Sequence, residues 1–257
     1  MTDTAIRSFG YRYDLERRNQ LEIDGHEPEQ LLKAFRATFP PTNPEANPLG
    51  VFDILNQGNV GSCQGHALAG IFSICYFLAT GRREHFSRAC GYYIAQRYDG
   101  INGDNGSTLS GGNKVATEHG MCLEKDWPYT GRYEPREPTG LNYLYKLKRS
   151  KPLRTLELVK EWRDAGLPIQ TGMSWGNAAD REVVDNWSPG GGGHSTVFWQ
   201  RTPGGNTRML NSWGSWMADG MNEWSDNAIT QLLRHSWTEL IGYAPDEMSF
   251  PIPDPIT

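Results

Sequence analysis

A long apolar run directly after a cysteine is the feature that most constrains how this chain can fold. Residues 64–78 are apolar almost all round, which is typical of a helix buried in a domain core. Because Cys63 stands just before this run, we expect its thiol to lie in the first turn of the helix. Free backbone N–H groups and the positive end of the helix dipole favour thiolate over thiol there. Gln57, six residues earlier, would bring a carboxamide donor close to that thiol.

A free cysteine usually packs in the core. Two distant segments indicate that Cys63 has a further role. His194 follows a run of glycines at 190–193 and enters a short strand of β-branched and aromatic residues. Asn211 comes one hairpin later, after a turn at 203–206. Cys63 precedes His194 by 131 residues and Asn211 by 148. Both separations fall in the window of roughly 130–150 residues known for one class of thiol hydrolase.

Taken in order, these motifs resemble the papain-like cysteine peptidases over residues 51–243. The family pattern Gln-Gly-x-x-Gly-Ser-Cys matches Gln57 to Cys63, and the family's Gly-Gly pair matches Gly111 and Gly112. The family histidine matches His194, and Asn-Ser-Trp-Gly matches residues 211–214. The variant around Cys63 and the short N-terminal extension resemble bacterial or phage members more than lysosomal ones.

The resemblance implies an α+β fold of two lobes, with the cysteine on a helical lobe, the histidine and asparagine on a β lobe, and the cleft between them. Cys63 would attack an acyl carbon and form a thioester, with His194 as the base that activates it. Asn211 would orient the imidazole, and Gln57 would donate to the oxyanion. A thiolate–imidazolium pair is the resting state this arrangement predicts. The substrate-binding residues implied are Gly111, Gly112, Gly193 and Trp213.

The chain departs from the family at three places near the nucleophile. Val60 and Leu109 occupy the positions of a family disulfide, and Gln64 stands where a tryptophan usually follows the nucleophile. With those bridge positions empty, we expect reduced cysteines, although four of them (Cys63, Cys75, Cys90 and Cys122) allow three pairings. The polar Gln64 means that substrate preference cannot be copied from the family.

Three regions are predicted along the chain. Residues 1–50 form an N-terminal extension with a helix over 28–39 and a proline-rich connector over 40–48; it either inhibits the enzyme or braces its two lobes. Residues 51–245 form the catalytic domain, with a helical lobe over 51–150 and a β lobe over 151–245. Residues 246–257 form an extended tail. Within the domain we expect helices at 63–78, 87–98 and 155–165, a loop over 99–112, and strands at 168–174, 195–201 and 207–211.

Composition and charge indicate which classes of binding partner this chain can have. A net charge of −5 offers no basic face for nucleic acid, and a protein or peptide substrate is expected. No membrane span of about 18 apolar residues and no signal peptide is recognised, so a cytoplasmic or virion-associated protein is predicted. No cofactor and no metal are expected: His119 and Cys122 lack a second ligand pair, and no Lys-Ser/Thr follows the glycine run at 190–193. The sequence does not indicate an oligomeric state.

Two other functions fit the same residues. One is a catalytically idle relative that uses the fold as a binding module, such as a virion or assembly component. The other is a thiol acyl transferase, which would pass the acyl group to an amine instead of water. The intact set Gln57, Cys63, His194 and Asn211 favours a reactive enzyme over the idle relative.

Overall fold

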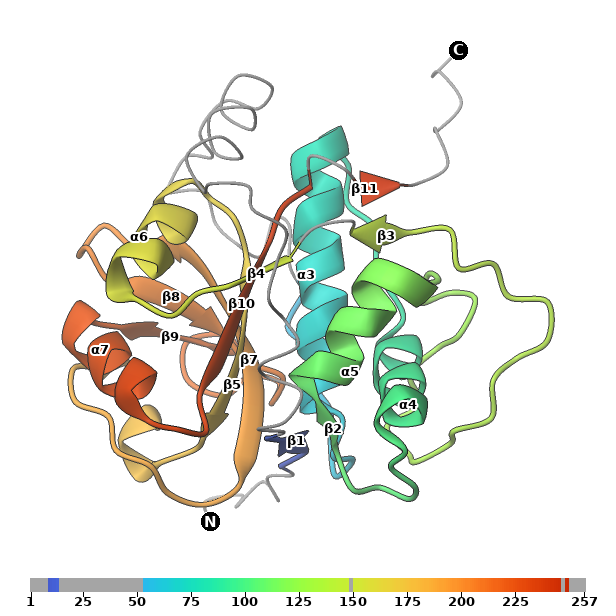
Figure 1. Cartoon of the computed structure of the whole chain (residues 1–257), viewed down its shortest axis with the longest axis horizontal. Coiled ribbons are helices and arrows are strands. Elements are labelled where there is room, and N and C mark those ends of the chain that lie inside the picture. Colours follow the sequence, from blue (N-terminus) through green and yellow to red (C-terminus); the bar gives the residue numbers. More distant parts are fainter. Residues whose placement is uncertain (1–8, 14–52, 148–149, 246–247, 250–257) are drawn as a thin grey trace.

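The computed structural model describes residues 9–13, 53–147, 150–245 and 248–249. The predicted helix at 28–39 and the connector at 40–48 lie outside these residues. The described chain forms a helical part and a β part that face each other, as the two-lobe prediction required (Figure 1). The tail expected over 246–257 is described only at β11 (Met248–Ser249), which pairs with β3 (Lys146–Leu147).

The helical part is built on α3 (Cys63–Thr80), the apolar helix predicted from the sequence. α4 (Arg88–Asp99) crosses it closely, because a Cβ on Gly65 would lie 2.6 Å from the backbone nitrogen of Tyr92. Only glycine permits that approach. α3 ends at Gly81, which adopts a left-handed conformation with φ of 69° and donates its N–H to the Phe77 carbonyl.

The loop predicted over 99–112 is shorter than expected. It contains β2 (Ser107–Thr108) and ends where α5 (Leu109–Lys114) begins, followed by a π-helical turn over Val115–His119. Thr108 caps α5 by accepting a hydrogen bond from the Gly111 backbone, and this cap outweighs the glycine-rich composition that favoured a loop.

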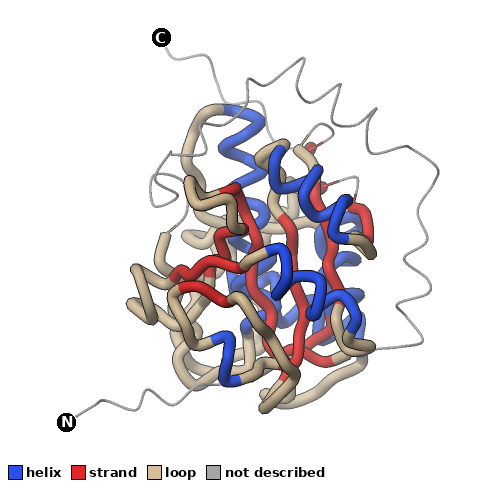
Figure 2. Tube along the Cα trace, turned by 90° about the vertical axis from the view of Figure 1, so that its left-hand side faces the viewer, coloured by secondary structure: helices blue, strands red, loops and turns tan. Residues whose placement is uncertain are grey.

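The β part is a sheet with strand order β4-β10-β5-β7-β8-β9-β6. All its neighbouring strands are antiparallel except β6 and β9. β5, β7 and β8 match the three predicted strands, whereas β4, β6, β9 and β10 were not predicted. The strand bounds are β4 Ser150–Pro152, β5 Ile169–Ser174, β6 Val183–Val184, β7 Gly193–Arg201, β8 Thr207–Leu210, β9 Met221–Trp224 and β10 Glu239–Tyr243. Figure 2 shows the strands side by side with helices around them.

Two further helices, α6 (Leu156–Asp164) and α7 (Asp226–Arg234), cover the sheet on the side away from α3 (Figure 1). α6 was predicted, but α7 was not. A short 3-10 turn spans Asn177–Ala179. α3 contacts β5 and β7 directly, so the N-terminus of the core helix lies beside the strand that carries His194.

One described helix, α3, is long and apolar enough to cross a membrane by length and composition alone, and 83% of that stretch is buried within the fold. A buried core helix passes the same test of length and composition, and the burial of α3 is that of a core helix.

Candidate active site

Cys63 is the first residue of α3, and its side chain is fully buried. Backbone groups of Ser195, Gly10, Gln64 and Tyr11 hydrogen-bond to the thiol. Their N–H groups favour the thiolate, but the loss of water around the sulfur has the larger effect and raises the pKa of Cys63 to about 11. In this covered arrangement, burial therefore favours the neutral thiol over the predicted thiolate–imidazolium pair.

His194 lies near the start of β7 and is also fully buried. Its Nε2 is 2.7 Å from Oδ1 of Asn211. Because an amide oxygen only accepts, this contact assigns the ring proton to Nε2 and leaves Nδ1 as the basic nitrogen. Since Ser195, the next residue along β7, contacts the Cys63 thiol, the strand brings His194 and Cys63 to the same place. Cys63, His194 and Asn211, which are far apart in the sequence, thus lie together in the structure.

Aromatic rings surround the imidazole. Trp213 stacks on His194 with ring centroids 4.4 Å apart and planes at 24°, and Trp175 meets the same ring edge-on at 4.9 Å. Trp213 was singled out from the sequence, but Trp175 was not. Trp175 follows β5, in which Met173 is paired with His194, so only the strand register reveals its position.

Gln57 is fully buried and firmly held. Its side-chain Nε2 donates to the Val60 carbonyl at 2.9 Å, and its Oε1 accepts from the Ser212 hydroxyl at 2.6 Å. Its backbone N–H donates to the Ser212 carbonyl at 2.8 Å. The loop before Cys63 is therefore tied to the residue that follows Asn211, although 155 residues separate the two.

The predicted substrate-binding glycines have different surroundings. Gly111 and Gly112 lie inside α5, where a Cβ would collide with Asp99 and with the Gln64 side chain, respectively. These contacts do not put the pair in a groove, so their role stays a prediction. Gly193 begins β7, and a Cβ there would lie 2.1 Å from the Tyr11 carbonyl oxygen.

β1 (Tyr11–Arg12) lies between the helical part and the β part (Figure 1). The Phe9 ring meets His194 at 6.0 Å and Trp213 at 5.8 Å, both edge-on. Gly10 touches the Gly61 backbone so closely that a Cβ would lie 1.7 Å from the Gly61 carbonyl oxygen. β1 (Tyr11–Arg12) pairs in parallel with β2. The connector predicted at 40–48 lies outside the described residues, so its position relative to Cys63 and His194 stays a prediction.

Within the described residues, no group of three or more His, Cys, Asp or Glu side chains is arranged to hold a metal ion. All four cysteines are free and buried. Val60 and Leu109, at the family's bridge positions, are both part of the buried core.

Comparison with known proteins gives the fold a name. No protein-family profile matches the chain, and no curated protein sequence does. Solved structures do match. Xylellain, a cysteine protease from Xylella fastidiosa, is 23% identical with a TM-score of 0.70, over 92% of this chain and 96% of that one.

Plant cysteine proteases match less closely. The proform of Amb a 11, a ragweed pollen allergen, is 19% identical with a TM-score of 0.61; the match covers 76% of this chain but 62% of that one. The Carica candamarcensis protease CMS1MS2, solved in complex with E-64, is 16% identical with a TM-score of 0.59, over 76% of this chain and 94% of that one. The chain therefore has the papain-like fold that these cysteine proteases share.

Proposed function

We propose that the protein is a cysteine peptidase that hydrolyses peptide bonds through a thioester. The observation that carries this proposal is the 2.7 Å contact between His194 Nε2 and Asn211 Oδ1, made beside a cysteine at a helix N-terminus. Such a contact orients an imidazole for proton transfer, and a purely structural histidine in an aromatic shell does not require it. The papain-like fold, shared with proteases, supports the same reaction class.

In the proposed reaction, the Cys63 sulfur attacks the substrate carbonyl carbon while its proton passes to Nδ1 of His194. The tetrahedral oxyanion is stabilised by the Gln57 carboxamide and the Cys63 backbone N–H. The C–N bond then breaks, His194 returns the proton to the leaving amine, and a thioester remains on Cys63. Water, deprotonated by His194, hydrolyses the thioester and regenerates the thiol. Asn211 holds the ring orientation throughout.

The proposal includes a latent state in which residues 9–13 occupy the substrate position. Cys63 and His194 are both 0% exposed, and Phe9, Gly10 and Tyr11 are among the groups that cover them. A substrate cannot reach the sulfur while these residues stay. Of the two roles predicted for the N-terminal extension, this covering favours inhibition over bracing. Because the segment is tethered, weak contacts suffice to keep it in place.

The setting predicted from the sequence, a bacterial or phage protein in the cytoplasm or in a virion, belongs to this proposal and rests on the sequence alone. An oligomeric state is not part of it.

Labelling with an epoxide peptide probe, followed by mapping of the modified residue, tests the reaction. We expect slow labelling of Cys63 in the full chain and rapid labelling in the full chain with Phe9→Ala and Tyr11→Ala, which also cleaves casein. Cys63→Ala in that background should abolish cleavage. Equal labelling of Cys75, Cys90 or Cys122 would contradict the nucleophile assignment.

The same preparation separates the alternatives. An idle binding module would leave Cys63 unlabelled even with the segment opened. In an acyl transferase, the probe would also label Cys63. When an amine is supplied, however, its main product would be the peptide acyl group joined to that amine. Unchanged labelling on opening the segment would reject the latent state in favour of a brace.

A further inference from the structure

Two side chains of the helical part hold the two residues of β2. The Ser107 hydroxyl donates to Oε1 of Gln64 at 2.8 Å. Asp99, the last residue of α4, accepts from the Thr108 backbone N–H at 2.8 Å and from the Thr108 hydroxyl at 2.7 Å. Gln64 and Ser107 are fully buried. Each residue of β2 is therefore fixed by its own side-chain partner, one from α3 and one from α4.

The two adjacent glycines of α5 leave the space that these partners occupy. A Cβ on Gly111 would lie 2.5 Å from Oδ1 of Asp99, and a Cβ on Gly112 would lie 1.8 Å from Nε2 of Gln64. Both atoms are at the ends of side chains, but those side chains are held by β2, so moving them breaks the bonds to Ser107 or Thr108. Gly112 thus makes room for Gln64, as Gly111 does for Asp99.

β2 in turn holds the chain that covers the nucleophile. The Ser107 N–H donates to the Gly10 carbonyl at 2.8 Å, and β1 pairs with β2 in parallel. Gly10 and Tyr11 contact the Cys63 thiol through their backbones. The Gln64 side chain therefore connects the residue after the nucleophile to the strand on which the covering segment is paired.

Glutamine is a costly residue at this buried position unless its oxygen is needed. Nε2 of Gln64 has no hydrogen-bond partner among the described residues, and an unpaired buried donor lowers stability. An apolar side chain of the same size would avoid that cost. The tryptophan that usually follows the nucleophile in the papain-like family could not replace it either, because an indole N–H only donates and cannot accept from Ser107.

We propose that Gln64 is a positioning residue for the reaction: by accepting from Ser107, it holds β2 where an extended chain crossing Cys63 is bound. The inference rests on the proposed peptidase function and deepens it. Gln64 meets the sulfur only through its backbone, whereas its side-chain oxygen is bonded to β2. Its side chain therefore acts on the binding of a chain over Cys63, whether residues 9–13 or a peptide, and leaves the bond-breaking step unchanged.

The first test removes the hydrogen bond from either side, in the full chain opened by Phe9→Ala and Tyr11→Ala. Gln64→Leu is of similar size but has no acceptor, and should raise KM for a peptide about fivefold with little change in kcat. Ser107→Ala should do the same, and it decides the question if Gln64→Leu does not fold. The double variant should be no worse than either single one. A lower kcat at unchanged KM, or losses that add, would overturn the inference.

The second test concerns the fit between Gln64 and Gly112. In the same opened chain, the added methyl of Gly112→Ala should displace the Gln64 side chain and raise KM about as much as Gln64→Leu does. Together with Gln64→Ala, which vacates the space, Gly112→Ala should have no further effect. An equal rise in KM in both backgrounds would mean that Gly112 meets the peptide itself, and the role given to Gln64 would be wrong.

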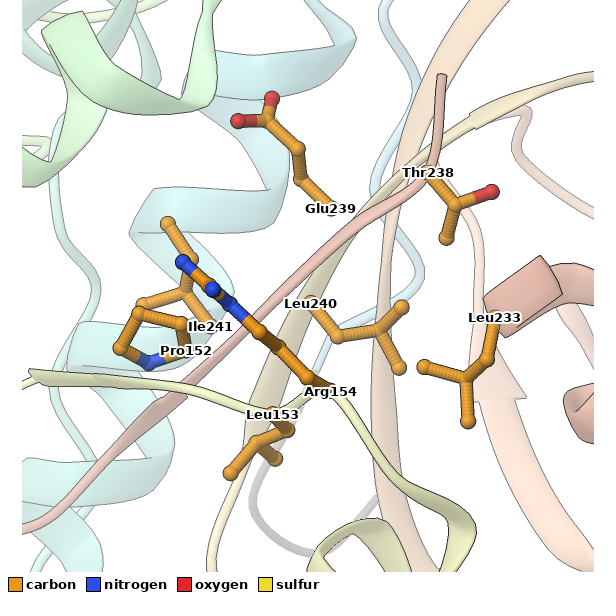
Figure 3. Close-up of a pocket in the computed structure, with 8 residues that line it drawn as sticks. All are labelled: Pro152, Leu153, Arg154, Leu233, Thr238, Glu239, Leu240 and Ile241. Carbon is orange, nitrogen blue, oxygen red and sulfur yellow. The ribbon is translucent and has the colours of Figure 1, made fainter. Parts of the chain in front are cut away.

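Thr238→Val is the matched control, because it also removes one buried hydroxyl. Thr238 is 5% exposed and lines a small pocket beside β10 with Leu233 and Leu240 (Figure 3). Its hydroxyl has no hydrogen-bond partner among the described residues. The variant should leave KM and kcat unchanged. A rise in KM equal to that of Ser107→Ala would show that loss of any buried hydroxyl suffices, and would overturn the inference.

Alkylation of Cys63 by iodoacetamide separates failure of the positioning role from failure of the peptidase proposal, because it requires no cleavage. In the otherwise unchanged full chain, Gln64→Leu and Ser107→Ala should loosen the contact with Gly10 and speed alkylation about fivefold, whereas Thr238→Val should not. Faster alkylation without any peptide cleavage by the opened chain would reject the peptidase and keep the positioning role. Unchanged alkylation would reject the positioning role, whether or not peptides are cleaved.

Discussion

The Cys63 side and the His194 side of the reacting centre are held by different interactions. On the Cys63 side, buried hydrogen bonds fix the backbone: Gln57 is held by Ser212, and the Tyr129 hydroxyl donates to the Gln57 carbonyl at 2.8 Å. On the His194 side, the ring lies among Trp213, Trp175 and Phe9. One side is directional and polar, and the other is apolar and shields by packing.

This difference matches the task that the proposed reaction gives to each side. An oxyanion donor must be aimed within tenths of an ångström, and short hydrogen bonds in a dry site supply that precision. A base must exchange protons while its hydrogen bond to Asn211 stays out of water, and tryptophan rings exclude water without adding a charge that would shift its titration. Substitutions on the two sides should therefore lower turnover to different extents. The largest loss is expected for the base.

The largest effect is expected on the β side. His194→Ala removes the proton acceptor and should lower turnover of the opened full chain by roughly 10³–10⁴-fold. Asn211→Ala removes orientation alone and should cost less. Turnover on a peptidyl amide measures both, and circular dichroism establishes that the fold is kept.

His85→Ala is the control for this pair, because His85 is exposed and pairs with Asp53 away from the reacting centre. It should leave turnover unchanged. If Asn211→Ala proved more damaging than His194→Ala with both folded, the roles given to the two residues would be wrong.

The contact between His194 and Asn211 could be predicted from the sequence, because both residues sit in local patterns. His194 lies in β7 and Asn211 directly follows β8, the next strand of the hairpin, so their spacing along the chain nearly determines their contact. Trp175 directly follows β5, and the partners of that strand, β7 and β10, are remote from it in sequence. No local pattern specifies that register. Residues 9–13 were missed for the same reason, since their partners follow at positions 61, 107 and 193–195.

A smaller effect is expected on the polar side. Gln57→Ala removes one oxyanion donor, which typically costs about 2.7–4 kcal/mol in the transition state. Turnover should fall by roughly 10²–10³-fold while KM changes little, because the donor matters once negative charge has developed. Steady-state kinetics in the opened full chain measure this split.

Ser212→Ala provides the companion variant for Gln57. It keeps the carboxamide but removes the hydroxyl that donates to Oε1 at 2.6 Å, so turnover should fall less than in Gln57→Ala. An equal loss in KM and turnover for Gln57→Ala would indicate ground-state binding and contradict the oxyanion role.

The smallest expected effect is on folding stability, and it comes from a titratable group buried on the polar side. His66 follows Cys63 by one turn of α3, and its Nδ1 lies 3.0 Å from the Ser62 carbonyl. Burial, followed by the charge of Arg88, lowers the pKa of His66 to about 3. The folded protein therefore keeps this ring neutral at pH values where an unfolded chain, with a histidine pKa of about 6.5, would bind a proton.

The sign of the stability effect follows from that difference. Above pH 6.5 neither state binds the proton, and the folded state has its full stability. As pH falls from there toward 3, only the unfolded chain gains the proton, so each pH unit costs about 1.4 kcal/mol. Between pH 7 and pH 5 the loss should be about 2 kcal/mol. His66→Gln does not titrate and should lose less over the same interval, whatever its stability at pH 7. Urea unfolding of both proteins at the two pH values measures the difference; parallel losses would mean that His66 is protonated in the folded state, and the polar side would then hold a charge beside the nucleophile.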